Sequence, residues 1–298
     1  MNQLNDNSQA PGEDLLSLIE GLGGVLASVE ELTRLKRSDS PRASFRLNLA
    51  DGRIFKGRQF DTKDQRTSVT SLLSKLEGLP FNSVIATRGI ATIEEWIVGS
   101  PLVMRDVRNE FIVTSANVLG RLHSIQDYPR ETPFIPEPET VSLDRIKHEL
   151  DDLHRQGLLR GDTVLPLFYI AEDNKPAELK FGFIHTDFHP ENMVVTTDGT
   201  LYIIDNEHIK IGALDFDLAR SWSRWPMNDS QREIFRMTYE ENRRLDEFFT
   251  HEKFWAVLSL TRTAYIHARH RKANQMALDQ LHLISGSKGK ITWPTLGS

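Results

Sequence analysis

The stretch "FIHTDFHPENMVVTTDGTLYIID", residues 183–205, places histidines, aspartates and an asparagine at one end of a short apolar hairpin. The Asp198-Gly199 dipeptide between two apolar runs is typical of a tight hairpin turn. If these two residues form the whole loop, Asn192 falls directly opposite Asp205, where opposed Cβ atoms lie about 4.5–5.5 Å apart. The sequence therefore predicts that an amide and a carboxylate meet at the open end of this hairpin.

Oxygen atoms in this arrangement suit Mg²⁺, which binds through one or two carboxylates and completes its octahedron with substrate phosphates. Asn192 and Asp205 are therefore candidate magnesium ligands. Asp187, five residues before Asn192, reaches the same end of the hairpin from the preceding loop. An aspartate there could accept a proton from a substrate hydroxyl and orient it for attack on phosphorus. The alternative is that these polar residues only cap the hairpin.

A second hairpin is predicted over residues 44–60, "SFRLNLADGRIFKGRQF", where apolar and polar residues alternate around another Asp-Gly pair. With a two-residue loop, Lys56 lies across from Leu47 on the apolar face of the hairpin. The members of that face are then Phe45, Leu47, Leu49, Ile54 and Lys56. Because an unpaired buried ammonium is costly, such a lysine either snorkels to solvent or meets an anion. Lys56 is thus either a phosphate contact or a lysine at a sheet margin.

Residues 67–80, "TSVTSLLSKLEGLP", carry apolar side chains at the i, i+3, i+4 and i+7 positions of one helical face. Glu77, at the edge of this stripe, either reaches a lysine on the neighbouring sheet or is solvated. Further along, "ATIEEWIVGSPL" (91–102) predicts a strand that runs into a Gly-Ser-Pro break between two lobes. Trp96 and Ile97 at the strand end would line an adenine pocket or be buried in the core.

These motifs, taken in order, resemble those of one enzyme group. "HTDFHPEN" (185–192) resembles the Brenner-type catalytic loop of the aminoglycoside phosphotransferase and choline kinase group, which shares the protein-kinase fold. Asp205, thirteen residues after Asn192, resembles the metal-binding aspartate of protein kinases. "ANVLGRLHSI" (116–125) is similar to the family's helix that ends in Leu-His, and a glycine and "DLA" (217–219) follow downstream. The resemblance runs from roughly residue 44 to 225.

The resemblance implies an α+β, two-lobed protein-kinase-like fold. Residues 1–99 would form a nucleotide-binding lobe, a small antiparallel sheet with a helix, in which residues 1–11 are expected to be disordered. Residues 100–298 would form a larger, mainly helical lobe that carries the catalytic hairpin and binds the acceptor. The implied enzyme is a Mg²⁺-dependent phosphotransferase that transfers the γ-phosphate of ATP, or GTP, to a hydroxyl of a small acceptor such as an aminoglycoside or amino-alcohol.

Site roles carry over from the resemblance to the matching positions. Asp187 would be the catalytic base, Asn192 and Asp205 the magnesium ligands, and Lys56 the contact to the α- and β-phosphates of the nucleotide. The segment that forms the nucleotide hinge would consist of Trp96, Ile97 and Val98.

Two features depart from the family pattern. The glutamate that normally pairs with the phosphate lysine is expected near the start of the helix at 67–77, where Ser68 and Thr70 stand. Glu77 either replaces this glutamate or the pair is absent. The phosphate-covering loop "KRSDSPRAS" (36–44) contains no glycine, so its cover would rely on three serines, Ser38, Ser40 and Ser44.

The histidines of the loop leave a rival hypothesis open. The resemblance implies that His185 and His189 brace the loop through hydrogen bonds, while Asp217 holds its backbone. In a metal-dependent hydrolase, His185, Asp187 and His189 would instead be a run of metal ligands, with His208 nearby. A second rival, a catalytically weak kinase-like protein that binds a ligand without turnover, is motivated by the missing glutamate and glycines.

The composition limits cofactors and partners. The 298 residues include no cysteine, which excludes disulfides and thiolate metal sites, and the net charge of −6 disfavours a nucleic-acid partner. No apolar run approaches the roughly 18 residues of a membrane span, and the polar start "MNQLNDNSQAPGED" lacks a secretory signal. We therefore expect a cytoplasmic monomer or homodimer. Residues 100–298 carry 24 basic and 29 acidic side chains, a balance that slightly favours a cationic acceptor.

Overall fold

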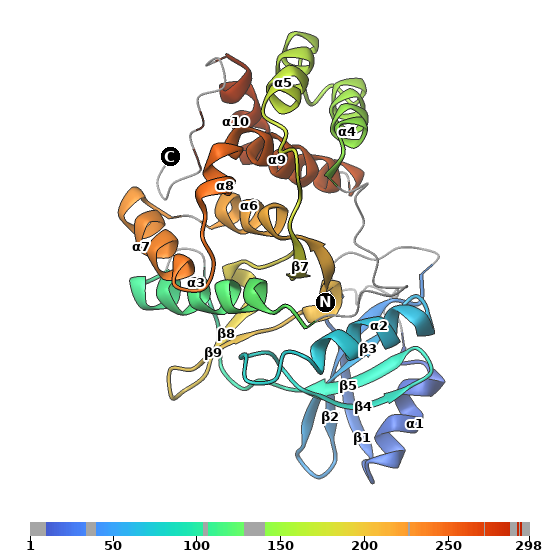
Figure 1. The fold of residues 1–298 in the computed structure, drawn as a ribbon. Helices are drawn as coiled ribbons and strands as arrows, with labels where there is room; N and C mark the ends of the chain where they lie inside the picture. Colours follow the sequence, from blue (N-terminus) through green and yellow to red (C-terminus); the bar gives the residue numbers. More distant parts are fainter. Residues whose placement is uncertain are drawn as a thin grey trace. The chain divides into compact units, whose positions relative to one another are not determined.

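The computed structural model describes residues 10–33, 40–103, 107–127, 141–225, 227–270, 272–286, 291 and 293. The chain divides into two compact units (Figure 1), and the first division falls between Gly99 and Ser100. The segment 196–204 belongs to the N-terminal unit, while 100–195 and 205–298 form the C-terminal unit. Most of the start that we expected to be disordered, and Ser38 of the predicted phosphate-covering loop, lie outside the described residues.

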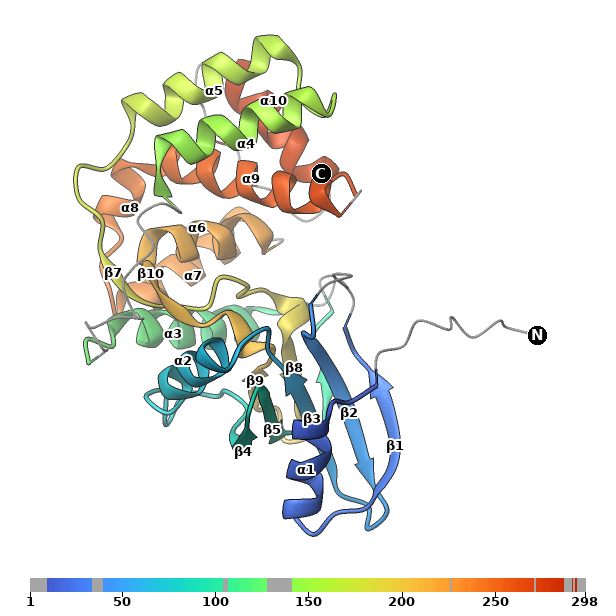
Figure 2. The same cartoon turned by 90° about the vertical axis from the view of Figure 1, so that its right-hand side faces the viewer.

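The N-terminal unit is built on a five-stranded antiparallel sheet with strand order β1-β2-β3-β5-β4. The strands are β1 (Leu26–Glu31), β2 (Ala43–Leu49), β3 (Ile54–Gln59), β4 (Val84–Arg88) and β5 (Ala91–Glu95). Helix α1 (Glu13–Gly21) packs on one face of this sheet (Figure 2) and buries Leu15 and Ile19 against Phe45, Leu47 and Ile93. The alternation of buried and half-buried residues along β2 therefore directs its apolar side chains towards α1.

The loop between β2 and β3 has three residues, not the predicted two. Leu49 N–H donates to Arg53 O at 2.9 Å, and Gly52 N–H donates to Leu49 O at 3.0 Å. Gly52 closes the loop with φ 89°, a left-handed conformation that glycine adopts without a steric cost. The predicted register is therefore wrong by one residue. Lys56 pairs with Arg46 instead of Leu47 and lies on the face opposite Leu47.

Helix α2 (Lys63–Leu73) begins and ends earlier than predicted. Thr62 is its N-cap, and the threonine hydroxyl accepts a hydrogen bond from Gln65 N–H at 3.1 Å. Within the helix, Val69 and Leu72 are buried as the apolar stripe predicts. Glu77 lies in the turn after the helix, so its predicted place at the edge of the helical stripe is wrong. It is exposed, which agrees with the alternative that it is solvated.

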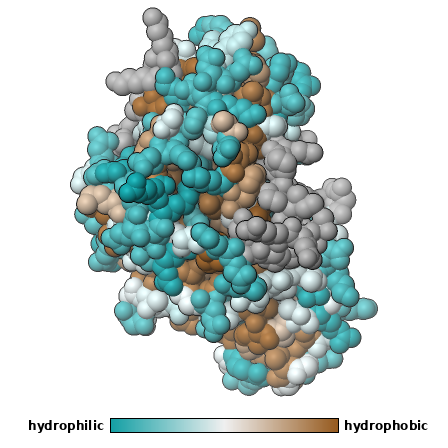
Figure 3. Space-filling view, viewed as in Figure 1, coloured by the Kyte–Doolittle hydropathy of each residue, from teal (hydrophilic) through white to brown (hydrophobic). Residues whose placement is uncertain are grey.

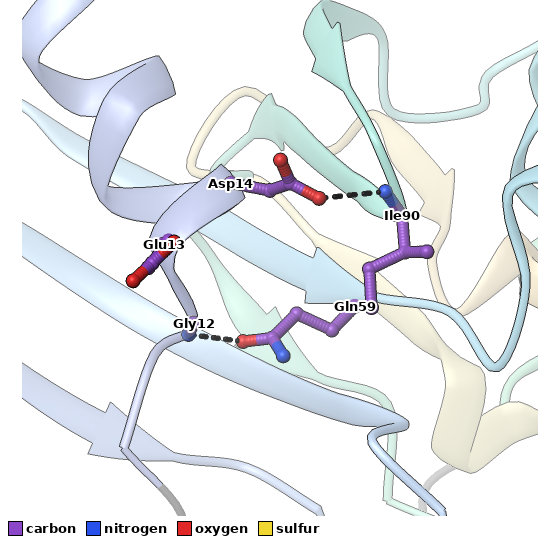
Figure 4. Close-up of a pocket in the computed structure, with 5 residues that line it drawn as sticks. All are labelled: Gly12, Glu13, Asp14, Gln59 and Ile90. Carbon is purple, nitrogen blue, oxygen red and sulfur yellow. Dashed lines mark hydrogen bonds between the residues drawn. The ribbon is translucent and has the colours of Figure 1, made fainter.

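A pocket of about 300 Å³ lies where α1 begins (Figure 4). Two hydrogen bonds cross it: Gly12 N–H donates to Gln59 Oε1 at 2.8 Å, and Ile90 N–H donates to Asp14 Oδ2 at 3.0 Å. A Cβ atom at Gly89, in the β4–β5 turn, would lie 1.9 Å from Asp14 Oδ2. These contacts fix the start of α1 on the sheet, and none of these residues belongs to the predicted site.

The C-terminal unit is mainly helical. Its helices are α3 (Asn109–Ser124), α4 (Leu143–Arg155), α5 (Gly161–Asp173), α6 (Leu214–Arg224), α7 (Asp229–Glu240), α8 (Asp246–Thr250), α9 (Glu252–Arg269) and α10 (Gln275–Gly286). Helix α9 packs against α4, α5, α6 and α10, and α3 packs against α7 (Figures 1 and 2). Short strands complete the unit: β7 (Phe181–Ile184) pairs with β10 (Lys210–Ala213), and β6 (Ser100–Pro101) pairs with β8 (Met193–Val195).

Aromatic packing anchors α6 inside this unit. Trp222 on α6 makes edge-to-face contact with Phe235 on α7 at 5.5 Å between ring centroids, and Trp225 donates its indole N–H to Phe188 O at 3.1 Å. Both tryptophans are buried. Because this packing holds the aromatic side of α6 in place, the polar side of the same helix has a fixed position as well.

The surface is largely hydrophilic in the face that Figure 3 shows, with hydrophobic areas between. Exposed apolar side chains of the N-terminal unit include Leu16, Val25, Val29 and Ile85. Among the described residues, no helix is long and apolar enough to cross a membrane.

Candidate active site

The predicted catalytic loop follows β7 and contains strained backbone. Thr186 has φ 64° and Asp205 has φ 66°, and within the described ranges they are the two non-glycine residues with positive φ. Such a conformation costs about 1–3 kcal/mol and is unusual for a β-branched residue. Both residues lie in the segment from which the site was predicted, so neighbouring contacts must hold this segment in place.

Asp217, in the first turn of α6, holds the loop by its backbone. One carboxylate oxygen accepts a hydrogen bond from Thr186 N–H at 2.6 Å, and the other accepts from His185 N–H at 2.8 Å. Arg220, one turn later, donates Nε–H to Thr186 O at 2.7 Å. The prediction that Asp217 holds this backbone is confirmed.

A chain of buried polar groups positions Asp217 in turn. Arg243 donates to the Tyr239 hydroxyl at 3.2 Å, and that hydroxyl donates to His123 Nδ1 at 2.6 Å. The other ring nitrogen of His123 then donates to Asp217 at 3.1 Å. Burial lowers the pKa of His123, which agrees with a neutral ring of this tautomer. Burial alone would raise the pKa of Asp217, but the hydrogen bonds from the His123 ring and from the His185 backbone N–H hold it below its ordinary value.

His185 braces the loop, as predicted. Its side chain is buried, and its Nδ1 accepts a hydrogen bond from Asp187 N–H at 3.3 Å. The proton therefore sits on Nε2, which donates to Asn206 Oδ1 at 3.0 Å. Because both ring nitrogens have protein partners, His185 does not offer a lone pair to a metal.

The carboxylate of Asp187 lies among cations and an amide. Its Oδ2 accepts from Asn192 Nδ2–H at 2.7 Å and lies 3.5 Å from His189 Nε2. Its Oδ1 forms an ion pair with Arg224 and lies 3.9 Å from Arg220 Nη2. Burial would raise the pKa of Asp187, but the hydrogen bond from His189 and the charge of Arg224 hold it well below its ordinary value. Asp187 is therefore ionised at neutral pH and can accept a proton.

Asn192 presents its amide oxygen away from Asp187. The amide nitrogen donates to both the backbone O of Asp187, at 2.9 Å, and its carboxylate, at 2.7 Å. The planar amide thus leaves Oδ1 for another partner, and an amide oxygen is a ligand that Mg²⁺ accepts. Asp205, at the N-terminus of the short helix η4 (Asn206–His208), is partly exposed and carries a second suitable oxygen donor. These donors fit a hard cation, and their role as ligands stays a prediction.

The loop at Asp198-Gly199, from which Asn192 was predicted to pair with Asp205, differs from the prediction. Thr196 N–H donates to Thr200 O at 2.9 Å, and Gly199 N–H donates to Thr196 O at 3.0 Å. The loop therefore has three residues, 197–199, and Gly199 ends it with φ 85°. The two-residue loop that placed Asn192 directly opposite Asp205 is wrong, and the derived register is off by one residue.

The structure gives no support to the hydrolase hypothesis. Among the described residues, no group of three or more histidine, cysteine, aspartate or glutamate side chains could hold a metal ion. Both ring nitrogens of His185 have hydrogen-bond partners. His189 Nε2 lies 3.5 Å from Asp187 Oδ2, and His208 Nε2 lies 3.6 Å from Glu207 Oε1. His185 and His189 therefore contact groups of the loop and its surroundings, and the described residues offer no cluster in which they would bind a metal together.

Arg220 and Arg224 were missed in the sequence analysis. They follow Asp217 by three and seven residues, a spacing that places all three on one face of α6. That spacing, within "DLARSWSR", is the sequence signal that could have found them.

In the N-terminal unit, the carboxylate that faces Lys56 is Glu94. The two residues are paired between β3 and β5, and Lys56 is 9% exposed. Glu94 accepts from Arg58 Nε–H at 2.9 Å, Asn82 Nδ2–H at 2.8 Å and Thr92 Oγ1–H at 3.1 Å. Burial would raise the pKa of Glu94, but the charges of Arg58 and Lys56 lower it below its ordinary value. Glu94 was not singled out from the sequence, although it lies in the strand "ATIEE" on the same face as Thr92.

The other predicted nucleotide contacts lie in irregular segments. Trp96, Ile97 and Val98 directly follow β5, and Arg46 stacks on the Trp96 ring at 4.9 Å from its centroid. Val98 is 69% exposed. Ser40 donates its hydroxyl hydrogen to Asp61 and accepts from Arg42 N–H at 3.1 Å. The roles of these residues, and that of Glu77, stay predictions.

The structure resembles solved kinases and phosphotransferases of low sequence identity. Choline kinase LicA from Streptococcus pneumoniae is 14% identical, with a TM-score of 0.64 over 91% of this chain and 96% of that chain. Ethanolamine kinase from Plasmodium vivax is 13% identical, with a TM-score of 0.61 over 88% and 84%. Spectinomycin phosphotransferase APH(9)-Ia, solved with ADP and spectinomycin, is 13% identical, with a TM-score of 0.63 over 94% of both chains. These likenesses confirm the predicted α+β, protein-kinase-like fold.

A search of curated proteins found no match. The model of the phosphotransferase enzyme family (APH) matches residues 89–248, more than half of the chain. The matched range contains the loop of Asp187, the support from α6 and the helix that carries His123. The chain belongs to the phosphotransferase enzyme family.

Proposed function

We propose that this phosphotransferase transfers the γ-phosphate of ATP, or of GTP, to a hydroxyl of a small acceptor. The observation that carries the proposal is the ionised Asp187, held in a strained loop by Asp217 and bonded to the amide of Asn192. Phosphoryl transfer depends mainly on positioning and charge neutralisation, and a rigidly held carboxylate can orient an attacking hydroxyl and receive its proton.

Asn192 and Asp205 would hold Mg²⁺ through their side-chain oxygens. When bound, the ion would neutralise charge on the nucleotide phosphates. Support comes from the amide orientation of Asn192, whose oxygen is left for a ligand. The amicoumacin kinase hAmiN, a structural neighbour with 12% identity and a TM-score of 0.64 over 96% of both chains, was solved with AMP-PNP and Ca²⁺, which agrees with nucleotide and divalent-ion chemistry on this fold.

Lys56 would contact the α- and β-phosphates, and Glu94 would orient it. This assignment revises the earlier choice of Glu77, because Glu94 is buried and paired with Lys56 across the sheet, whereas Glu77 is exposed. Trp96, Ile97 and Val98 would bind the base. Ser40 would cover the phosphates.

The acceptor would be a small alcohol. The neighbours are kinases of choline, ethanolamine and amicoumacin and phosphotransferases of aminoglycosides, so this fold serves hydroxyl groups on varied small molecules. We propose that the protein works in the cytoplasm as a monomer or homodimer, without a nucleic-acid or membrane partner.

Nucleotide binding and transfer can be tested on the full chain. ATP with Mg²⁺ should raise the melting temperature saturably, and Asp187→Asn should retain this shift. The same variant should lower the rate of transfer about 10²–10⁴-fold, because it removes the proton acceptor. The proposal fails if the wild-type protein shows neither a nucleotide-dependent shift nor ADP formation from ATP. Unchanged turnover in Asp187→Asn would instead show that the base is assigned wrongly.

A kinase-like binding protein without turnover is a second candidate. It is favoured by the ion pair between Asp187 and Arg224, which occupies the carboxylate oxygen that a base would use. A nucleotide-dependent shift with no ADP formation across aminoglycoside, amino-alcohol and sugar acceptors would support this candidate.

A further inference from the structure

Two arginines lie against the carboxylate of the proposed base. Asp187 is shared by two guanidinium groups: Arg224 forms its ion pair with Oδ1, and Arg220 Nη2 lies 3.9 Å from the same oxygen. Arg220 is 8% exposed and is tied to Thr186 O, so it cannot leave the loop without breaking that bond. The side chain of Arg224 is 20% exposed, and Asp187 is its ion-pair partner among the described residues.

A second cluster, between helices α4 and α9, repeats the pattern. Glu149 on α4 is 1% exposed and shares one carboxylate oxygen between Arg145, at 3.0 Å, and Arg262 of α9, at 2.5 Å. Helix α9 packs against α6, and the charge of Arg262 acts on Arg220. In these two clusters, four guanidinium groups are therefore set against two carboxylates.

Further basic groups continue along the C-terminal part of α9. His267 is in the last turn of α9, and Lys272 follows the helix, with its backbone N–H donating to His267 O at 3.0 Å. After burial, the charges that lower the pKa of His267 are those of Arg224, His270, Lys272 and Arg220, all of them basic. Glu191, an exposed carboxylate, acts electrostatically on His189.

The pairing of two guanidinium groups with the one carboxylate of Asp187 disfavours a cationic acceptor at that carboxylate. An ammonium group would be repelled by Arg220 and Arg224 and would compete with them for Asp187. A carboxylate or phosphate, in contrast, matches the planar fork of a guanidinium and can bind it through two parallel hydrogen bonds. The overall acidity of residues 100–298 pointed the other way in the sequence analysis, because it averages over side chains far from the site.

We infer that the acceptor is a hydroxyl-bearing organic anion, and that its carboxylate or phosphate binds Arg224. This inference rests on the proposed kinase function and names the class of its acceptor. Binding of the anion would exchange the partner of Arg224, which would release Asp187 Oδ1 to accept the hydroxyl proton. The acceptor would thus uncover the base only when its anionic group is in place, while Arg220 would stay with the loop as a positioning residue.

The inference can be tested with four small alcohols that differ in charge. Glycerate and glycerol 3-phosphate are anionic, glycerol is neutral, and 3-aminopropane-1,2-diol is cationic. Calorimetry on the full chain should detect saturable binding of at least one anion, about tenfold or more tighter than that of the neutral and cationic compounds. Arg224→Gln should weaken the anion about tenfold or more, and Arg224→Lys should recover part of the loss.

Arg244→Gln is the matched control, because Arg244 is 90% exposed and belongs to the same unit. This variant should bind the anion as the wild type does. The inference is overturned if the aminodiol binds more tightly than the anions or if no anion binds. It is also overturned if Arg224→Gln and Arg244→Gln weaken anion binding equally. A nucleotide-dependent melting shift, measured without these compounds, separates the two proposals: if it persists while anion binding fails, only the acceptor class is wrong.

Discussion

At the scale of single residues, the hydrogen bonds around His123 determine which of its ring nitrogens carries the proton. Tyr239 receives a hydrogen bond from Arg243 and donates to His123, so the ring of His123 must accept at Nδ1 and donate from Nε2. That donation reaches Asp217, whose two oxygens also hold the loop of Asp187. A hydroxyl on α7 therefore contributes to the geometry of the site through two intermediates.

Tyr239→Phe tests this chain. The variant removes the hydroxyl and leaves Nδ1 of a buried histidine without its donor, which should lower the free energy of unfolding by about 1–3 kcal/mol. Urea titration measures the change. Tyr169→Phe is the control, because Tyr169 is 54% exposed in the same unit, and its loss should fall within about 0.5 kcal/mol. Equal effects of the two variants would show that the hydroxyl of Tyr239 is not energetically engaged.

At the scale of elements, both Asp-Gly hairpins form where the sequence predicts them, but with a different register. An Asp-Gly dipeptide is compatible with a two-residue loop and with a three-residue loop that ends in a left-handed glycine, and the dipeptide alone does not distinguish them. A loop that is longer by one residue shifts every cross-strand partner by one residue, and this shift changed the face of the sheet assigned to Lys56. The place of Asp187 in the loop and the support of the loop by Asp217 were predictable, because they lie within short, ordered motifs. For Arg224 and Glu94 the sequence offered only a helical spacing and a strand face. Their contacts with Asp187 and Lys56 could not be predicted, because these contacts depend on how whole elements pack.

Gly52→Ala measures the backbone cost of the β2–β3 loop. A Cβ at this position meets nothing within 4 Å, so only the conformation at φ 89° opposes alanine. We expect the free energy of unfolding to fall by about 1–2 kcal/mol. Gly21→Ala is the control: its Cβ also meets nothing within 4 Å, its φ is not left-handed, and it ends helix α1. Because alanine favours the helix, Gly21→Ala should raise stability by about 0.4–1 kcal/mol. A loss of stability in both variants would contradict the assignment of the cost to backbone conformation.

At the scale of the whole molecule, the two units should respond differently to acid. Burial lowers the pKa of His123, His189 and His267, and all three lie in the C-terminal unit. In the N-terminal unit, the pKa of Glu94 lies below the ordinary glutamate value of 4.5. The ordinary value for histidine is 6.5, so an unfolded histidine takes up its proton at a higher pH than Glu94 does. Acidification below pH 6.5 should therefore act first on the C-terminal unit.

The sign follows from proton uptake. Below pH 6.5 the unfolded chain protonates these histidines, while the folded state keeps them neutral down to their lowered pKa. The unfolded state therefore binds more protons, and stability falls as pH decreases.

Urea unfolding between pH 7.5 and about 5, followed by tryptophan fluorescence in a Trp96→Phe background, measures this loss of stability, because the remaining tryptophans lie in the C-terminal unit. His123→Gln should flatten the pH dependence of stability, whatever its effect on stability itself, and His208→Gln, whose side chain is 41% exposed, should not. A slope that is unchanged in His123→Gln would mean that His123 titrates alike in the folded and unfolded states, and the neutral, hydrogen-bonded ring that positions Asp217 would have to be abandoned.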